Sequence, residues 1–410
     1  MEFKEKALQD IGIEIIDGDR GKNYPNGEDF NKEKYCLFLN AKNVTYNGFE
    51  FNEKVFIDKQ KDQILRKGKL KRNDIVLTTR GTIGNVAFYS DNIKYDNIRI
   101  NSGMVIIRNN DFININNKYI YWYLKSQKMR EKIIEMKTGT AQPQLPISIL
   151  KKIKIILPCK RIQDKITKIL DSIEQKIELN NQVNDNLYEI GKSYYKYFFK
   201  QYKHTNKFIE TEFGRIPIDY EVKSLFEVTK NNREKVKDDT EYKVLSAVKT
   251  GNLQLSEEYF NKIVPSTELN KYIIVKKDDF AYNPARINIG SIGRNEYDFK
   301  TCVSPVYVSF SIDNKYKYFW DFYFKDITFK REVNTRASGS VRQALKYEDL
   351  GLIKLVYPNK DIIDKFNYLY NKIDINIKQR KKENKILKQL RDTLLPKLMN
   401  GEIDLENIEI

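Results

Sequence analysis

Two long segments of the chain carry apolar residues at helical spacing. From 162 to 194 these residues recur mostly at steps of three and four, and 362–394 shows a comparable stripe with polar breaks at Arg380 and Asn384. A narrow stripe of this kind is typical of a coiled-coil seam. The pattern therefore predicts two long helices. Because an exposed apolar stripe needs a partner, we expect the two helices to pack on each other antiparallel.

The segments that precede the two helices match each other. Gly139 and Gly339 are 200 residues apart, and so are Pro158 and Pro358. Several features in one order with one offset are not expected by chance, so the sequence predicts an internal duplication. The matched segments are a strand with a Gly-rich turn (71–85 and 276–293), a β-branched strand (102–107 and 303–308), an aromatic helix (119–124 and 318–324), a polar loop (138–145 and 337–345) and an apolar strand (153–158 and 353–358).

This organisation predicts an α+β protein with two homologous globular domains joined by long, antiparallel, coiled-coil-like helices, as a pseudo-twofold repeat. A chain of 410 residues is long enough for such a division. We expect the first domain at 1–158, a helical spacer at 159–205, the second domain at 206–358, a second spacer at 359–400 and a tail at 401–410.

The chain is basic. Lys and Arg outnumber Asp and Glu by 73 to 56, a formal net charge of +17. This favours a polyanionic partner, but it does not distinguish nucleic acid from an anionic membrane surface, and a Lys-rich proteome would explain it equally well. The start of the chain has no signal-peptide-like apolar run, and nowhere do about eighteen apolar residues follow one another. We therefore expect a cytoplasmic protein.

The residues that could carry redox or metal chemistry are few. Cys36, Cys159 and Cys302 are far apart and form no CxxC pair, which argues against a disulfide framework or a zinc site. The single histidine, His204, excludes a multi-histidine metal site. We expect reduced thiols and no bound metal.

No sequence motif indicates an enzyme. The segment 282–286 is the nearest to the Asn-Pro-Pro-Tyr motif of adenine methyltransferases, but it lacks the second proline and the aromatic residue. The glycine-rich segments 81–84 and 290–293 lack the lysine of a phosphate-binding loop. We interpret these segments as strand-to-turn structure. The sequence predicts no catalytic residues and no cofactor bound by this chain itself.

Arginines and amides at turns are the candidates for reading DNA, because Arg pairs with guanine and Asn or Gln with adenine in the major groove. An arginine in a turn could instead brace the fold or contact phosphate. The aromatic helices could offer stacking surfaces, but a whole domain needs such residues for its core. The DNA-binding candidates are Arg80, Gln142 and Gln144 in the first domain and Arg286, Asn288, Arg336, Arg342 and Gln343 in the second.

The order of domain, helix, domain, helix resembles the specificity subunits of type I restriction-modification systems. Local motifs agree across nearly the whole chain. Segment 214–217, followed by 222–225, is similar to the opening of a target-recognition domain in that family, and 16–25 is similar to a variant of a first such domain. Segments 177–182 and 394–403 resemble the family's two helical regions. The first half departs from the family pattern because it lacks a Gly-x-Ile-Pro opening.

The resemblance implies a non-catalytic subunit with two target-recognition domains, each reading one half of a split double-stranded DNA target. It implies two methyltransferase (M) subunits and restriction/motor (R) subunits as partners. S-adenosylmethionine, ATP and Mg are expected on those partners. Two alternatives stay open from the residues alone: a diverged self-contained DNA methyltransferase, and an assembly scaffold that does not bind DNA.

Overall fold

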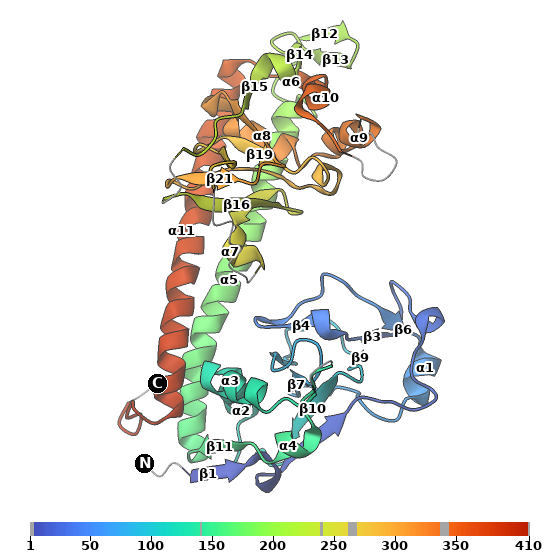
Figure 1. Ribbon diagram of the computed structural model, residues 1–410, viewed down its shortest axis with the longest axis vertical. Coiled ribbons are helices and arrows are strands. Elements are labelled where there is room, and N and C mark those ends of the chain that lie inside the picture. Colours follow the sequence, from blue (N-terminus) through green and yellow to red (C-terminus); the bar gives the residue numbers. More distant parts are fainter. Residues whose placement is uncertain (1–3, 140–141, 238–240, 261–268, 337–343, 409–410) are drawn as a thin grey trace. The chain divides into compact units, whose positions relative to one another are not determined.

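The computed structural model divides into two compact units (Figure 1). Unit 1 comprises Met1–Asn181 and Lys381–Ile410, and unit 2 comprises Gln182–Arg380. Each of the two long helices therefore contributes one half to each unit. The structure describes residues 4–139, 142–237, 241–260, 269–336 and 344–408.

A four-stranded antiparallel sheet forms the centre of unit 1. Its strands lie in the order β2 (Ile13–Asp17), β10 (Met104–Asn109), β7 (Ile75–Thr78) and β8 (Val86–Phe88). Strands β7 and β10 are rich in Val and Ile and almost fully buried, as expected where both faces of a sheet are covered. The other strands of unit 1 are β3 (Cys36–Phe38), which pairs with β6 (Phe56–Ile57) and in parallel with β9 (Ile98–Arg99), the hairpin β4 (Val44–Thr45) and β5 (Gly48–Phe49), and β1 (Lys4–Ala7), which pairs with β11 (Lys154–Leu157).

Helix α2 (Asn117–Lys125) joins the central sheet of unit 1 to the long helices. The Asn116 side chain caps its first turn by accepting from the backbone of Lys118 at 2.9 Å. Trp122 is buried, and its indole nitrogen donates to Asp171 at 2.9 Å. The predicted core role of the aromatic helix is therefore confirmed. The remaining helices of unit 1 are α1 (Lys59–Ile64), α3 (Gln127–Glu135) and α4 (Ile147–Lys151).

Unit 2 repeats the strand order of unit 1. Its central sheet has the order β15 (Thr229–Asn232), β22 (Val308–Ile312), β19 (Phe280–Tyr282) and β20 (Ile292–Arg294). This identity of topology confirms the predicted duplication. The other strands are β16 (Lys243–Val248), which pairs with β17 (Asn252–Leu255) and in parallel with β21 (Thr301–Val303), β18 (Ile273–Ile274) beside β21, and β14 (Glu221–Ser224) beside β23 (Lys354–Tyr357).

One hairpin of unit 2, β12 (Phe208–Thr211) and β13 (Gly214–Pro217), contains the Gly-x-Ile-Pro motif. The helices of unit 2 are α6 (Leu225–Val228), α7 (Ser256–Phe260), α8 (Lys317–Tyr323), α9 (Ile327–Arg336) and α10 (Tyr347–Gly351). Short 3₁₀ turns are at Leu8–Asp10, Gly27–Asp29, Ala41–Asn43, Ile287–Ile289 and Asn314–Tyr316.

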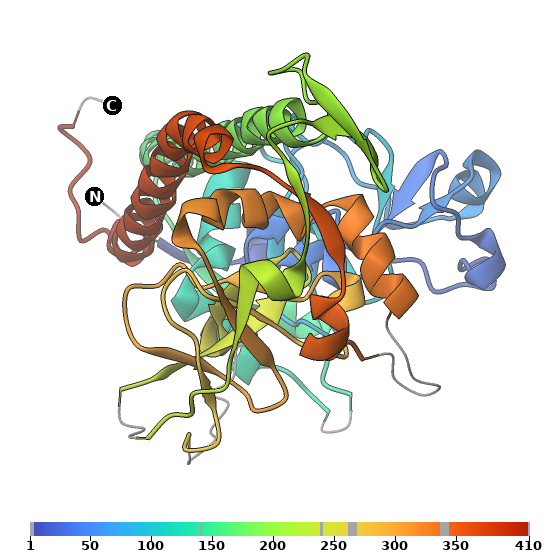
Figure 2. The ribbon, with the colours of Figure 1, turned by 90° about the horizontal axis from the view of Figure 1, so that it is seen from above.

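The two predicted long helices are α5 (Lys160–Phe199) and α11 (Lys360–Met399), each of 40 residues and offset by 200. They pack side by side, as two views at right angles show (Figures 1 and 2). In unit 1, Glu174 accepts from Arg391 at 2.8 Å and Asn180 donates to Asn384 at 2.8 Å. Residue numbers rise along α5 while they fall along α11, so the helices are antiparallel, as predicted.

The polar break at Asn384 lies inside the helical seam of unit 1. Asn180 and Asn384 are both buried, and the Asn180 amide also donates to Glu383 at 2.9 Å. The Asn384 amide donates in turn to Asn181 at 2.9 Å. Because a slip of the helices would leave these amides buried without partners, this polar layer favours one register of the pair.

The two units differ at one buried aspartate. Asp74, just before β7, is paired with Arg108 of β10 at 2.6 and 2.9 Å. The corresponding Asp279 precedes β19, where an extension of the β19–β22 register by one residue places Ser311 opposite it. Burial raises the pKa of Asp279 to about 6, although hydrogen bonds to its carboxylate oppose the shift.

Asp279→Asn is therefore expected to stabilise unit 2 near neutral pH. Between about pH 4 and pH 6 the folded chain binds the Asp279 proton more tightly than the unfolded chain, so the free energy of unfolding falls as pH rises through this window. The variant should be more stable than the wild type by about 1 kcal/mol at about pH 7 and equal to it at about pH 4. Urea unfolding at the two pH values measures this difference. Asp74→Asn is the control and should destabilise near neutral pH, since it leaves Arg108 unpaired; an equal gain from Asp279→Asn at both pH values would contradict the assignment.

Candidate nucleic-acid interface

The structure brings Arg80 and Gln144 of unit 1 together. The guanidinium of Arg80 donates through Nε and Nη2 to Oε1 of Gln144 at 3.2 and 2.9 Å, and both side chains are exposed. Backbone hydrogen bonds fix the pair: the amide of the buried Leu145 donates to Thr79 at 2.9 Å, and Thr138 exchanges two bonds with Gln144 at 2.8 and 2.9 Å. Residues 64 positions apart in sequence thus present one preorganised arginine and amide at the surface.

Further loops meet at this pair. The backbone amides of Thr79 and Arg80 donate to the Gly103 carbonyl at 2.8 and 3.1 Å. Next to Gly103, the carbonyl of Ser102 accepts from the Arg20 guanidinium at 3.4 Å. We call Arg20, Arg80, Ser102, Gly103 and Gln144 the Arg80 cluster. Its two exposed guanidinium groups and its amide suit contacts with phosphates or base edges.

Gln142 is exposed near this cluster, but none of the described hydrogen bonds joins its side chain to Arg80. Arg20 was not among the DNA-binding residues predicted from the sequence. It lies more than fifty residues before the Arg80 turn, so only the similarity of segment 16–25 to a family motif could have drawn attention to it.

The described residues at the equivalent turn of unit 2 do not form an arginine and amide pair. The amide of Leu345 donates to the Pro284 carbonyl at 3.1 Å, as that of Leu145 does to Thr79. This correspondence puts Ala285 in the place of Arg80 and Ala344 in the place of Gln144. The two units therefore present different side chains from equivalent turns.

Arg286 is exposed at the start of the 3₁₀ turn Ile287–Ile289, and Asn288 within it is half-buried. The Arg286 carbonyl accepts from the backbone amide of Ser291 at 3.1 Å. The backbone of Arg286 thus stabilises the turn, and its side chain is at the surface. Helix α9 packs against this turn and carries Arg336. Arg336 is ion-paired with Glu332 on its own helix at 3.0 Å, which ties part of its guanidinium to α9. Arg342 and Gln343 lie outside the described residues.

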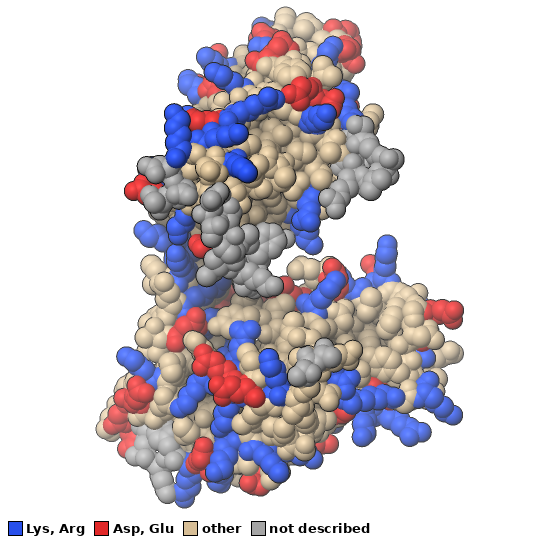
Figure 3. Space-filling model, in the orientation of Figure 1, with Lys and Arg blue, Asp and Glu red and all other residues tan. Residues whose placement is uncertain are grey.

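A basic cavity of about 490 Å³ adjoins the same turn of unit 2. It is lined by Arg233, Lys235, Lys271 and Lys346, by Glu348, which is paired with Arg233 at 3.0 Å, and by Pro284, which lies two residues before Arg286. Sequence reasoning did not single out these cations, because they come from segments spread over more than a hundred residues. Lys and Arg are scattered over the visible face of each unit and interspersed with Asp and Glu (Figure 3). Local loops, rather than one large basic patch on that face, therefore distinguish the candidate site.

The described residues contain no group of three His, Cys, Asp or Glu side chains that could hold a metal ion. Tyr282 of the near-methyltransferase segment is buried, with its hydroxyl donating to the Leu345 carbonyl at 3.1 Å, and Asn283 accepts from the backbone of Ala285 at 3.0 Å. Both side chains serve the strand and its turn, as the structural interpretation predicted. Burial raises the pKa of the Cys36 thiol to about 12, which keeps this cysteine protonated and unreactive. Within the described part of the chain no helix is long and apolar enough to cross a membrane.

Comparisons with known proteins agree with the fold and the motifs. A family model described as the type I restriction modification DNA specificity domain matches residues 1–189. The type I restriction enzyme MjaIX specificity subunit of Methanocaldococcus jannaschii is 25% identical over 359 residues, which cover 82% of this chain and 79% of that protein. The chain belongs to the specificity subunits of type I restriction-modification systems.

Two further relatives extend the comparison of this specificity subunit. The HindI specificity subunit of Haemophilus influenzae is 27% identical over 188 residues, 44% of this chain and 39% of that one. The crystal structure of the type I restriction-modification S subunit from M. genitalium has the same fold, with a TM-score of 0.58 and 17% identity over 97% of this chain and 96% of that chain. The family makes this chain a non-catalytic DNA specificity subunit, in preference to a diverged methyltransferase or a scaffold without a role on DNA.

Proposed function

We propose that the specificity subunit reads a bipartite double-stranded DNA target, with one target-recognition domain in each unit, at 1–158 and 206–358. The observation that carries this proposal is the repeated strand order with different side chains at equivalent turns, Arg80 and Gln144 in unit 1 against Ala285 and Ala344 in unit 2. Equal scaffolds position the loops alike, and unlike loops select unlike half-sites. The two halves of the target therefore differ in sequence.

In unit 1, Gln144 holds the guanidinium of Arg80 in one orientation, which leaves Nη1 and the Gln144 amide nitrogen available to DNA. An oriented arginine suits the O6 and N7 acceptors of guanine, and a good pair of this kind discriminates between bases by about 1–3 kcal/mol. Arg20 contacts a neighbouring phosphate. In unit 2, Arg286 and Asn288 read bases beside the cations of the basic cavity, and Arg342 and Gln343 stay candidates there.

The subunit acts within a type I restriction-modification complex. The finer proposal is that α5 and α11 bind two methyltransferase subunits, with restriction/motor subunits beyond them. Apolar side chains on the outside of the helical pair support this docking surface; they are Leu179, Ile190, Ile386 and Leu390. S-adenosylmethionine, ATP and Mg bind to those partners and not to this chain. The complex works in the cytoplasm, where the DNA is.

Methylation mapping tests the proposal. The chain is co-expressed with its methyltransferase, and methylated adenines are located in genomic DNA with and without the chain. We expect a bipartite motif that requires the chain and changes in one half when 206–358 is exchanged for the domain of a relative. Methylation that is unchanged by removal of the chain would exclude the proposal, and a domain exchange that altered both halves would exclude the assignment of one half-site to each unit.

A further inference from the structure

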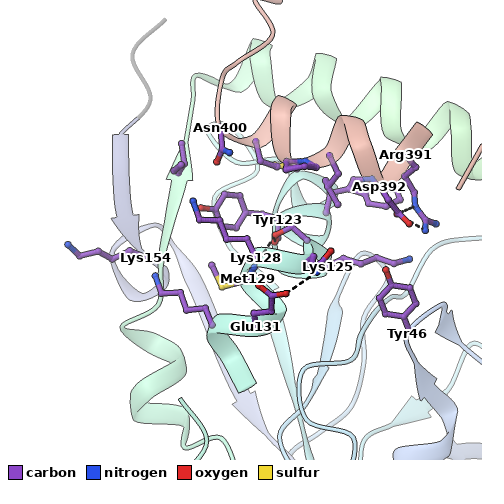
Figure 4. A pocket seen from close by; sticks show the side chains of 18 of the residues that line it. Tyr46, Tyr123, Lys125, Lys128, Met129, Glu131, Lys154, Arg391, Asp392 and Asn400 are labelled. Carbon is purple, nitrogen blue, oxygen red and sulfur yellow. Dashed lines mark hydrogen bonds and ion pairs between the residues drawn. The ribbon is translucent and has the colours of Figure 1, made fainter. Parts of the chain in front are cut away.

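Unit 1 contains a cavity of about 390 Å³ between the α2–α3 turn and the last turns of α11 (Figure 4). Lys125 ends α2, Lys128 lies in the first turn of α3, Arg391 lies in α11, and Asn400 follows the last residue of α11 (Figure 4). The apolar part of the wall is formed by Tyr46, Trp122, Met129, Leu395, Pro396 and Met399. Its size is within the range of small-molecule sites, and its lining combines this apolar part with many charged side chains.

Lys125 is a buried cation in this wall, only 8% exposed. Its ammonium donates to the Tyr121 hydroxyl at 2.9 Å and lies 5.3 Å from the centre of the Trp122 ring. No carboxylate among the described residues forms an ion pair with it, and the same holds for Lys128 and Lys132, which line the cavity from α3. An ammonium taken out of water without a counter-ion is unfavourable, so the cavity favours an anion.

The carboxylates that line the cavity are engaged elsewhere. Glu5 is paired with Lys154 at 3.5 Å, Asp392 with Arg391 at 2.9 Å, and Glu131 accepts from the Gln127 amide at 2.9 Å. Glu131 keeps its negative charge because Gln127 is neutral, but the lining still has five cations, from Lys125, Lys128, Lys132, Lys154 and Arg391, against these three carboxylates.

The N-terminus of α3 opens on the same cavity. Ser126, Gln127 and Lys128 all line it, and the Ser126 hydroxyl caps the backbone of Met129 at 3.3 Å. The first turn of this nine-residue helix adds the positive end of its dipole to the lysines.

The duplication supplies an internal comparison. At the offset of 200, Ser126 corresponds to Asp326, which begins α9 in unit 2. The Asp326 carboxylate accepts from the backbone of Thr328 at 2.8 Å and is paired with Lys200 at 3.0 Å. Unit 2 thus has a carboxylate at the position where unit 1 has a serine beside an open cavity. At the same offset, Asn400 of unit 1 replaces Lys200.

We propose that this cavity binds a small organic anion. Its phosphate or carboxylate group lies between the Lys125 ammonium and the first turn of α3, where unit 2 has the Asp326 carboxylate. Its flat apolar part lies against Tyr46, Leu395 and Met399. The site shares no residue with the Arg80 cluster. Binding of the anion is therefore separate from the contacts that select the DNA sequence.

Calorimetric titration of the full-length chain tests the site. The probes are adenosine monophosphate, benzoate and inorganic phosphate. We expect an organic anion to bind with a Kd of about 1 mM or tighter, and inorganic phosphate to bind more weakly because it lacks an apolar part. Preference for the nucleotide identifies a phosphate ligand, and preference for benzoate identifies a carboxylate ligand.

Three variants complete the experiment. Ser126→Asp places the carboxylate of unit 2 into unit 1. We expect it to weaken binding at least about tenfold and to raise the melting temperature, since its negative charge lies at the N-terminus of α3 beside lysines that form no ion pair with the described residues. Lys125→Met should weaken binding to a similar extent, and Lys151→Gln on exposed α4 should leave binding unchanged. Absence of binding by all three probes, or unchanged binding by Ser126→Asp, overturns the proposal. If no probe binds and the Ser126→Asp variant no longer assembles with the methyltransferase, the proposal is also overturned. That result would indicate that an acidic side chain of a partner subunit occupies the cavity.

Discussion

Replacing Arg294 with methionine is expected to destabilise unit 2 by about 3–5 kcal/mol. Arg294 is 5% exposed and is the common partner of three carboxylates. It bonds Asp321 at 2.8–3.2 Å and Glu296 at 3.1 Å, and it is also paired with Asp278. Without the guanidinium, the carboxylates of Asp278 and Asp321, which are 9% and 21% exposed, are left close together in a poorly hydrated site, while Glu296 is exposed to water. A fall in the urea midpoint of unit 2, followed by the fluorescence of the buried Trp320, measures the effect.

Two controls separate charge from packing. Arg331→Met on the exposed face of α9 changes the same residue type without a buried network, and it should shift stability by less than about 0.5 kcal/mol. Adding Asp278→Asn and Asp321→Asn to Arg294→Met should recover part of the loss, because the uncompensated charge is then smaller. An Arg294→Met protein as stable as the wild type would show that the network contributes nothing to folding.

The sequence predicted the architecture because both of its signals are periodic or repeated. The three-and-four spacing of apolar residues defined α5 and α11, and the offset of 200 defined two equal units. It did not reveal that Asn384 is hydrogen-bonded to Asn180 in the seam. A polar residue in an apolar stripe indicates a break in the helix contact unless its partner on the other helix is known. It also could not show that each helix is divided between the units.

The candidate site was predictable only in part. Arg80 and Gln144 were both chosen from turns, and the structure adds that they are in contact. Arg286 was chosen from the matching segment of the second half, but backbone hydrogen bonding makes Ala285, and not Arg286, the residue equivalent to Arg80. A shift of one residue within a turn changes which side chain faces the ligand, and sequence similarity in a Gly-rich segment does not fix it. Residues such as Arg20 and Lys271 lie at their sites because segments distant in the sequence pack together. No local sequence pattern predicts such contacts.

Arg80→Ala is expected to relax one base preference in a single half of the methylated motif, by about 10–100-fold for the best-read base. The reason is the fixed orientation of Arg80 on Gln144, which the shorter side chain cannot reproduce. Methylation mapping in co-expressing cells gives the readout. Arg80→Lys keeps the charge but loses the planar fork, so it should resemble Arg80→Ala in specificity. Arg286→Ala is the matched control and should alter only the other half. A uniform loss of methylation over all sequences would instead identify Arg80 as a phosphate contact.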